Sequence, residues 1–455
     1  MIKCPNCTGE LNFDPKATKV KCEYCGSIFD PKELKTKVKK TKEVETIEGK
    51  GYSCSQCGAT VMTFDNTAVT FCSYCGSQAM IEANMIEQNK PDWIIPFKKD
   101  KNDCIESYKK VLNRALFTPN SLKETATLEK FRGIYMPYCV YDLTSSGDNV
   151  FDGSKYSHRS GDYQIYNDFK IHTNVDSYCN GISYDMSSTF YDDYSQAIPF
   201  ETKDKESFNP NYLPGYYADK PDVPLETYDK MALNIAKSES KSYLVKTSQF
   251  RSHGCYNPML DYEIKSRSIA LYPIYFLAIR DKKEKNVYYA IVNGQTGKVA
   301  ADLPVSFSKY IIASLILSVI IFLIINFNLV VNPISLCIFA GVMAIASIFM
   351  SITQLSAIDR KKNHVNDEGY MSKMENRKKK EKIFGFRYLY KQIIALILPF
   401  IFVFSSVADD RYFYGSALIS LLLVLLSFKE LVKEHNILVS NKLPQLEKRG
   451  GDENA

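Results

Sequence analysis

The sequence predicts a multidomain fold: two small cysteine-rich β modules, a middle α+β domain, and a C-terminal α-helical domain that spans a membrane four times. Three observations predict it. Cys-x-x-Cys pairs recur four times within the first eighty residues, strand and helix patterns follow one another through the middle, and Tyr310–Ile358 contains 49 residues without a charged side chain. A chain of 455 residues is long enough for about three domains.

The N-terminal region contains eight of the thirteen cysteines, arranged in two quartets. The quartets are Cys4, Cys7, Cys22 and Cys25, and then Cys54, Cys57, Cys72 and Cys75. In each quartet fourteen residues separate the two Cys-x-x-Cys pairs, and the second quartet follows the first after 50 residues. The segment Cys22-Glu-Tyr-Cys-Gly-Ser27 matches Cys72-Ser-Tyr-Cys-Gly-Ser77 at five of six positions, which indicates an internal duplication.

This spacing is typical of zinc ribbons, because each pair of thiolates can bind one face of a metal tetrahedron and two pairs complete it. Gly26, Gly58 and Gly76 follow their pairs directly, where a tight turn with positive φ suits glycine. We predict two structural Zn²⁺ sites. Four thiolates leave no open position for water, so no zinc chemistry is expected. Bound metal would stabilise ribbons that bury little apolar surface.

Three other interpretations of the cysteines are disulfides, iron–sulfur ligation and redox catalysis. No signal peptide pattern precedes Cys4, so we expect these thiols in a reducing cytosol, where disulfides are disfavoured. A thioredoxin-like site would need a single Cys-x-x-Cys in a βαβ setting. Zinc is therefore favoured over all three.

The quartets place zinc ribbon 1 at residues 1–30 and zinc ribbon 2 at residues 51–86, joined by a charged linker at residues 31–50. Six lysines between Lys32 and Lys42 could contact the phosphates of a nucleic acid. Glu33, Glu43 and further glutamates interrupt or flank them, so a solvated linker is the favoured interpretation.

Residues 91–308 predict the α+β cytosolic domain. Trp93–Phe97 is expected to be an entering strand, and apolar residues at helical spacing follow, with Pro119 ending the run. A second helix is expected over Glu226–Ser248. The remaining expected strands are Ile134–Leu143, Val150–Tyr156, Tyr163–Thr173, Ser268–Ile279 and Val287–Val292.

Two of these strands share a pattern in which aromatic and apolar residues alternate around a proline, at Ile134–Tyr141 and Ala270–Leu277. We therefore expect two related β units. Proline lacks a backbone N–H, so each is expected at a sheet edge or at the start of a strand.

The middle domain shows no catalytic motif. Asn293-Gly-Gln-Thr-Gly-Lys298 lacks the spacing of a phosphate-binding loop, and a hairpin turn accounts for it better. Asp185, Asp192 and Asp193 could form an acid pair, but their spacing does not show that they converge. The five histidines are scattered without a metal or nucleophile partner at a recognisable spacing. We expect a protein that is not an enzyme.

Residues 309–428 predict four transmembrane helices, because about 20 apolar residues cross the hydrocarbon of a bilayer. The expected spans are Tyr310–Val331, Ile334–Ser356, Gln392–Ala408 and Tyr412–Phe428. No Asp, Glu, Lys or Arg lies inside them, which disfavours a transporter.

The loop at residues 359–391 sets the expected orientation. It holds eleven Lys or Arg against five Asp or Glu, and such an excess stays cytoplasmic. We expect a multi-pass protein of the cell membrane with both termini in the cytoplasm, including a cytosolic tail at residues 429–455. Lysines and arginines of this loop could also bind the headgroups of anionic membrane lipid.

The order of these motifs resembles the bacterial TFIIB-type zinc-ribbon membrane proteins, the YdjG-like group. The residues that carry the resemblance follow the two ribbons: Trp93-Ile-Ile-Pro-Phe97, Gly133-Ile-Tyr-Met-Pro-Tyr138, Asn211-Tyr-Leu-Pro-Gly-Tyr216 and Asn293–Lys298. The likeness covers nearly the whole chain, with Cys139 where an aromatic residue is expected. It implies a membrane-anchored accessory protein that holds a soluble partner at the cytoplasmic face, of the SPFH-domain or phage-shock type.

Two functions from different classes follow. The first is a non-enzymatic membrane-anchored scaffold whose zinc ribbons recruit a cytosolic protein partner. The second is a membrane-tethered nucleic-acid-binding or regulatory protein that uses the ribbons and the linker lysines. An enzyme housed in the middle domain is a third, less favoured, interpretation.

Overall fold

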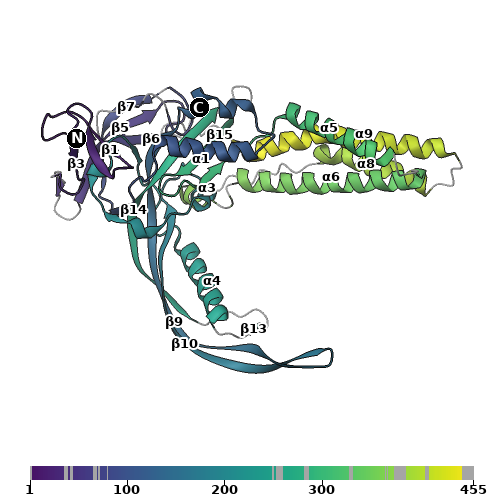
Figure 1. Ribbon diagram of the computed structural model, residues 1–455, viewed down its shortest axis with the longest axis horizontal. Helices are drawn as coiled ribbons and strands as arrows, with labels where there is room; N and C mark the ends of the chain where they lie inside the picture. The colour runs from purple at the N-terminus through teal and green to yellow at the C-terminus, as the bar shows by residue number, and fades with distance from the viewer. Residues whose placement is uncertain are drawn as a thin grey trace.

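A computed structural model describes residues 3–34, 39–40, 45–64, 69, 72–78, 80–247, 251–252, 260–280, 286–326, 332–363, 365, 367–373, 386–404 and 409–442. It shows three parts (Figure 1). The body contains both ribbons and the middle domain, the arm is a long β hairpin that leaves the body, and the bundle is a group of apolar helices that extends from the opposite end to the first ribbon.

The first ribbon forms a small sheet of its own. Its strands are β1 (Leu11–Asp14), β2 (Lys19–Cys22) and β3 (Ile28–Phe29), in the order β1-β2-β3. Leu11 and Val20 are buried and belong to the same core cluster as Phe97 of the middle domain. Ribbon 1 is therefore packed onto the body.

The second ribbon is longer than its cysteine spacing indicates. Its strands are β4 (Lys39–Lys40), β5 (Glu45–Cys54), β6 (Thr60–Thr63) and β7 (Met80–Asn89). β5 begins inside the segment expected to be the linker, and it pairs with β7 from Thr46↔Asn89 to Cys54↔Met80. β6 also pairs with a strand of the middle domain, β12 (Tyr217–Asp219). Ribbon 2 is thus part of the main sheet.

The main sheet contains fourteen strands among the described residues. Its longest strands are β9 (Arg132–Ser160), β10 (Tyr163–Asp185) and β14 (Asp261–Arg280). The shorter strands of the middle domain are β8 (Trp93–Ile94), β11 (Glu206–Ser207), β13 (Arg251–Ser252), β15 (Asn286–Asn293) and β16 (Val299–Ala301). β17 (Asn441–Lys442), which follows the bundle, joins the same sheet. The expected strand Trp93–Phe97 is therefore shorter than predicted, while the strands at 268–279 and 287–292 are confirmed.

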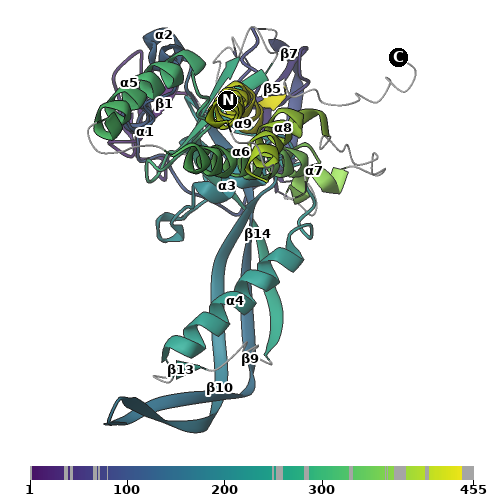
Figure 2. The same ribbon diagram turned by 90° about the vertical axis from the view of Figure 1, so that its right-hand side faces the viewer.

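Helices lie against this sheet as the apolar spacing predicts. α1 (Lys101–Arg114) begins at the Asp100 capping box and buries Cys104, Tyr108 and Leu112. α4 (Asp229–Thr247) matches the predicted second helix and lies along the base of the arm (Figure 2). The other helices and helical turns of the body are η1 (Asn120–Lys123), α2 (Thr125–Leu128), α3 (Asp192–Ala197), η2 (Thr202–Asp204), η3 (Pro210–Tyr212) and α7 (Glu368–Lys373).

The arm joins two strands that were expected to be separate short elements. β9 and β10 pair along the whole hairpin from Asp185↔Tyr138 to Tyr163↔Ser160, with register shifts at Ile165/Tyr166 and at Asn180/Ile182. Gly161 turns the chain with φ of +61°. The strands expected at 150–156 and 163–173 are segments of this hairpin. Sequence alternation indicated both segments but gave no sign of the length of the pairing.

The two proline-centred segments are neighbours in the main sheet, because β9 and β14 pair antiparallel and place Pro137 opposite Leu271 and Pro273 opposite Tyr135. Both prolines lie within strands, which differs from the edge or start positions that we predicted. The exception has a local reason. On the edge of β9 that faces away from β14, Pro137 lies between the end of β10 and the end of β12. On the edge of β14 that faces away from β9, Pro273 lies between the end of β8 and the end of β15. Neither proline therefore faces a strand that would need its missing backbone N–H.

Phe97 lies at the centre of the body. Its ring stacks on Tyr216 at a centroid distance of 4.1 Å and meets Tyr275 edge-on at 5.0 Å. Two glycines make this packing possible. A Cβ atom would lie 2.4 Å from a ring carbon of Tyr216 if added to Gly133, and 2.5 Å from a ring carbon of Phe97 if added to Gly294.

The bundle contains α5 (Phe307–Asn326), α6 (Pro333–Lys362), α8 (Phe386–Val403) and α9 (Asp410–Val439). Of the described helices, α6 and α9 are long and apolar enough to cross a membrane, at 30 residues each. Shorter apolar segments occur at Phe307–Ile320 and Leu389–Val403. The structure thus supports two of the four predicted spans by length and composition. Residues 327–331 and 405–408, at the ends of the other two, lie outside the described residues.

The ends of the two long helices are attached to the body. The Asn436 side chain of α9 accepts a hydrogen bond from the Val305 N–H at 2.7 Å and donates one to the Val305 carbonyl at 3.0 Å. Lys361 of α6 donates to the carbonyls of Leu438 and Ser440, at 2.8 and 3.0 Å. β17 follows α9 and pairs with β15. The bundle is therefore anchored in the main sheet.

Candidate metal centres

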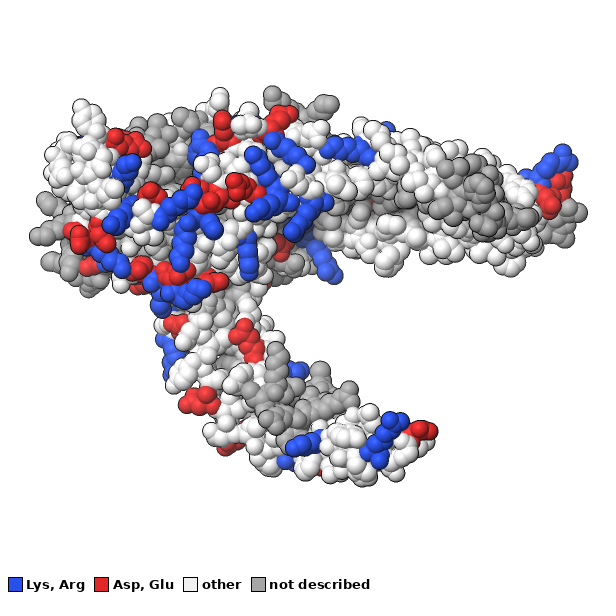
Figure 3. Space-filling model, in the orientation of Figure 1, with Lys and Arg blue, Asp and Glu red and all other residues white. Residues whose placement is uncertain are grey.

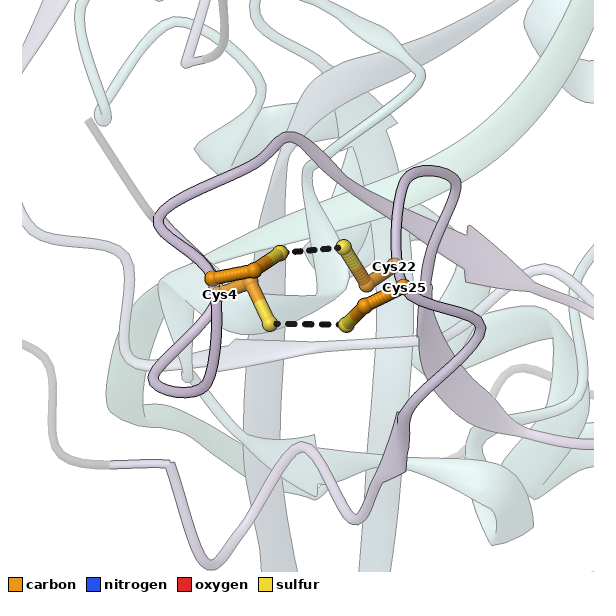
Figure 4. Close-up of side chains that lie close together, drawn as sticks. Cys4, Cys22 and Cys25 are labelled. Atoms are coloured by element: carbon orange, nitrogen blue, oxygen red, sulfur yellow. Dashed lines mark hydrogen bonds between the residues drawn. The ribbon is translucent and has the colours of Figure 1, made fainter.

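The structure brings the eight predicted cysteines together in the two predicted groups of four. Within each group all four Sγ atoms lie within 4.8 Å of one another. In ribbon 1 the Cys4 and Cys25 sulfurs are 3.7 Å apart, and those of Cys7 and Cys22 are 3.5 Å apart (Figure 4). The two pairs come from the turn before β1 and the turn after β2.

Ribbon 2 repeats this geometry. The sulfurs of Cys54 and Cys75 are 3.7 Å apart, and those of Cys57 and Cys72 are 3.6 Å apart. A tetrahedral zinc ion with bonds of about 2.3 Å would separate its sulfur ligands by about 3.8 Å. A disulfide would need about 2.05 Å. Both groups therefore have the dimensions of a four-thiolate zinc site.

The backbone holds each Cys-x-x-Cys pair in the same turn. The N–H of the residue after the second cysteine donates to the carbonyl of the first, at 2.9, 3.0, 2.7 and 2.9 Å for Thr8, Gly26, Gly58 and Gly76. All four residues have positive φ, between 60° and 73°. The predicted role of the three glycines is confirmed, and Thr8 is a non-glycine residue in the same conformation.

The pKa shifts of two buried thiols in ribbon 2 are also consistent with a bound cation. Hydrogen bonds from Cys57 and Cys72 lower the pKa of Cys75 to about 2. The hydrogen bond with Cys72 favours the Cys57 thiolate, but the neighbouring Cys75 and burial outweigh it and raise the pKa of Cys57 to about 12. Without a cation, Cys57 therefore keeps its proton while Cys75 ionises, whereas a bound cation such as Zn²⁺ would favour the thiolate form of both.

The two centres differ in exposure. All four cysteines of ribbon 2 are buried, and they share a core cluster with Ile134 and Phe276 of the main sheet. In ribbon 1 Cys25 is exposed and Cys7 is half-buried. A metal in ribbon 2 would therefore stabilise the body, and one in ribbon 1 would stabilise a module at its surface.

Of the three acidic residues that the sequence left unresolved, Asp185 and Asp192 converge inside the protein, whereas Asp193 is exposed. Asp185 and Asp192 are both buried, and the Asp192 carboxylate accepts hydrogen bonds from the Tyr228 hydroxyl at 2.8 Å and from the Glu368 N–H at 2.9 Å. Burial raises the pKa of Asp192 to about 6. The described residues around these carboxyls form no group with metal-ligating geometry. The arrangement connects structural elements and does not line an open cleft.

The Asn293–Lys298 segment is a hairpin turn, as predicted. The Asn293 N–H donates to the Lys298 carbonyl at 2.8 Å, and the side-chain oxygen of Asn293 accepts from the N–H groups of Gln295 and Thr296. Gly297 has φ of +78°. These contacts occupy the polar groups that a phosphate would need.

Sequence reasoning missed one contact of the second centre. Tyr74, between Cys72 and Cys75, donates a hydrogen bond to Asp219 of β12 at 2.7 Å. The available signal was the tyrosine repeated at the same place in both ribbons, Tyr24 and Tyr74, but no spacing pointed to Asp219.

Comparison with known proteins found a distant relative that aligns with most of the chain. The chain is 26% identical over 315 residues to an uncharacterised protein of Bacillus subtilis strain 168, YdjG, across 68% of this chain and 91% of that protein. No family model matches the chain. No solved structure matches it either. The similarity spans most of both chains but is too low to establish a family.

Proposed function

We propose that this chain is a non-enzymatic, membrane-anchored scaffold that binds two structural zinc ions and recruits a soluble protein to the cytoplasmic face of the membrane. The observation that carries the proposal is the separation of two exposed regions. Apolar side chains cover the bundle at one end of the molecule, and the exposed zinc ribbon lies at the other end (Figure 1).

The surface of the bundle supports the anchor. Large apolar side chains are exposed along all four of its helices, and the charged side chains visible on it gather toward its two ends (Figure 3). Exposed residues of α6 and α9 include Ile338, Phe339, Val342, Ile345, Leu418, Leu422 and Leu425. In water such a surface would aggregate, whereas in a bilayer it would meet lipid tails.

We also propose that α5 and α8 cross the membrane with α6 and α9. Their 20 and 18 residues span about 30 and 27 Å, close to the ~30 Å of hydrocarbon. α5 and α8 lead away from the body, and α6 and α9 lead back to it (Figure 1). α6 ends and α8 begins on the side of the body (Figure 1). The positive-inside rule assigns the side where the basic 359–391 segment connects these helices to the cytoplasm, together with both termini.

The zinc ions would hold the ribbons in shape and take no part in a reaction, because both groups supply four thiolates. The likeness to YdjG agrees with the proposed membership in the TFIIB-type zinc-ribbon membrane proteins. That resemblance is the source of the proposed partner type, a cytosolic SPFH-domain or phage-shock protein. Lipid headgroups would bind the basic segment.

A nucleic-acid partner is less favoured by the visible surface. Toward the ribbon end of the body, Figure 3 shows Lys and Arg side chains interspersed with Asp and Glu. A nucleic-acid-binding surface usually gathers basic residues into a stripe or patch.

Affinity purification of the full chain from detergent extracts tests the scaffold. Cys4→Ser combined with Cys7→Ser should remove a soluble protein that copurifies with the wild type, while the chain itself stays in the membrane fraction. Cys179→Ser is the matched control, because this half-buried cysteine lies outside both quartets. An unchanged set of partners would contradict the proposal. Salt-sensitive retention of DNA or RNA would favour the alternative function.

Protease added to intact cells tests the orientation. The body should survive and should be cleaved only after the membrane is opened. Cleavage of the body in intact cells would contradict a cytoplasmic location.

A further inference from the structure

The duplicated ribbons place one tyrosine in two opposite environments. Tyr24 and Tyr74 are 50 residues apart and occupy the same position, the residue before the last cysteine of each quartet. Tyr74 is only 1% exposed, whereas Tyr24 is 87% exposed. Their backbone turns agree, since Gly26 and Gly76 have φ of +73° and +68°. The difference therefore lies in what each turn contacts.

Tyr74 shows how this turn binds a protein surface. Its ring contacts Phe276 at a centroid distance of 5.5 Å, and its hydroxyl donates to Asp219 at 2.7 Å. The same Asp219 oxygen accepts a second hydrogen bond from the Ser187 hydroxyl at 2.6 Å. The pocket is thus apolar along its sides and has a carboxylate at its end. It accepts the one side chain that combines an aromatic ring with a hydroxyl donor.

Ribbon 1 cannot use its tyrosine on the body, because it is attached through a different surface. Phe13 of β1 meets the Tyr212 ring at 5.3 Å, and its N–H donates to the Pro214 carbonyl at 3.1 Å. The Asn211 side chain donates to the carbonyls of Pro31 and Leu34. These contacts fix the ribbon and leave the turn around Tyr24 pointing out of the packed interface.

The exposed turn has the composition of a binding surface. Besides Tyr24, Ile28 is 58% exposed and Cys25 is exposed. Ribbon 1 lies at the end of the molecule farthest from the bundle (Figure 1). With the bundle in a bilayer, this turn would therefore face the cytosol.

We propose that the Tyr24 turn of ribbon 1 binds a cytosolic protein by inserting the tyrosine into an apolar surface pocket that ends in an Asp or Glu carboxylate. This partner pocket is the counterpart of the one that Tyr74 fills within the chain. The inference rests on the proposed scaffold function and identifies the surface that performs the recruitment.

A second copy of the chain, a lipid bilayer and a nucleic acid fit the Tyr24 turn less well as binding partners. The corresponding pocket of a second copy is already filled by its own Tyr74. The bundle, which a bilayer would hold, lies at the other end of the molecule (Figure 1). Glu23 precedes Tyr24 and contacts Asn12, so a carboxylate stands beside the turn, which is unfavourable for a nucleic-acid phosphate.

Photocrosslinking of the full chain in cells tests the surface. p-Benzoylphenylalanine replaces Tyr24 in one variant and Tyr163 in a matched control, since Tyr163 is also a highly exposed tyrosine, at 78%, on the arm. A protein adduct is expected for position 24 and not for position 163. Mass spectrometry should map the adduct to a segment in which apolar residues surround an Asp or Glu. An adduct with lipid, nucleic acid or a second copy, an acid-free segment, or no adduct would overturn the inference.

Binding of the purified pair then measures the role of the hydroxyl. Tyr24→Phe should weaken binding about tenfold or more, because it removes a hydrogen bond to a charged group. Tyr163→Phe should leave the affinity unchanged. Replacing the mapped acidic residue of the partner by its amide should weaken binding by a similar factor. When both proteins carry their changes, the loss of affinity should be smaller than the sum of the two single losses. Full affinity of Tyr24→Phe would overturn the inference, while loss of the partner from the Cys4, Cys7 double variant would show that the scaffold function itself stands.

Discussion

The Asp192 carboxylate accepts a hydrogen bond from the backbone N–H of Glu368 at 2.9 Å, and this contact ties the segment between α6 and α8 to the body. Asp192 begins α3, and its other oxygen accepts from Tyr228 at the start of α4. A single buried carboxyl therefore connects the bundle side of the molecule with the base of the arm.

This carboxyl should make stability depend on pH. Burial raises its pKa from 3.8 to about 6, with Asp367 adding to the effect, so folding favours the protonated form. Its contribution is present below about pH 4 and is lost as the pH rises through about 6. Between pH 4 and 7, the free energy of unfolding of the wild type should fall by up to about 3 kcal/mol relative to Asp192→Asn.

Chemical denaturation of the full chain in detergent, at several pH values, measures this difference. Asp193→Asn is the control, since Asp193 is exposed in the same helix. Parallel pH profiles of the wild type and Asp192→Asn would contradict a raised pKa at this carboxyl.

The two proposed zinc centres should differ in what the loss of their metal does to the fold. Cys72 is buried within the main core, so Cys72→Ser should remove one zinc ion and unfold much of the body. A structural four-thiolate site contributes on the order of 10 kcal/mol. Cys25 is exposed on ribbon 1, so Cys25→Ser should also remove one zinc ion but leave the body folded.

Zinc content per chain, together with near-ultraviolet circular dichroism, distinguishes these outcomes. The wild type should contain two zinc ions per chain, one from each group. A zinc-free wild type would refute both centres. Equal unfolding by the two variants would contradict the difference in burial.

Thr8 should be a point of backbone strain. It has φ of +60° at the position where the other three Cys-x-x-Cys turns have glycine. Left-handed backbone costs a residue with a Cβ atom about 1 kcal/mol, and Thr8→Gly should relieve this in ribbon 1. The reverse exchange, Gly58→Thr, should destabilise ribbon 2 by at least about 1 kcal/mol, because Gly58 has φ of +73°.

Competition with a zinc chelator measures both effects, since a strained ligand turn releases metal more easily. Thr8→Gly should retain the first zinc ion at a higher chelator concentration than the wild type. A weaker hold on zinc in that variant would show that the Thr8 hydroxyl, which donates to the Cys7 carbonyl at 2.6 Å, outweighs the strain.

Gly133 should be intolerant of a side chain. An added Cβ atom would lie 2.4 and 2.7 Å from two ring carbons of Tyr216, which stacks on Phe97. Gly133→Ala should therefore cost roughly 1–3 kcal/mol, as overpacked cores do. Gly161→Ala is the comparison, because an added Cβ there meets no atom within 4 Å and only the positive φ opposes it. A smaller thermal shift for Gly133→Ala than for Gly161→Ala would contradict this packing.

The two groups of four cysteines could be predicted residue by residue, because ligand spacing is a local property. Cys-x-x-Cys pairs fourteen residues apart have few other uses, and the positive φ after each pair follows from the same turn. The helix at 101–114 was predictable for a similar reason, since apolar periodicity records which face is buried. The helix at 229–247 was also predicted.

The relation between modules was not predictable from these patterns. Ribbon 2 was expected to be a separate module after a linker. Instead, β6 pairs with β12, and the Tyr74 hydroxyl donates a hydrogen bond to Asp219, 145 residues away in the chain. The prolines of β9 and β14 were expected at edges, and their real surroundings depend on where four other strands end. Such contacts join distant segments, and no local spacing encodes them.

The sequence by itself determined the eight thiols, their division into two groups, and the long apolar segments, because coordination geometry and hydrophobicity act over a few neighbouring residues. Tertiary structure alone decided that all four cysteines of ribbon 2 are buried, whereas those of ribbon 1 are partly exposed. Both ribbons carry the same tyrosine in the same turn, and only the surface that each ribbon meets, an apolar pocket with Asp219 or solvent, gives the two copies different roles.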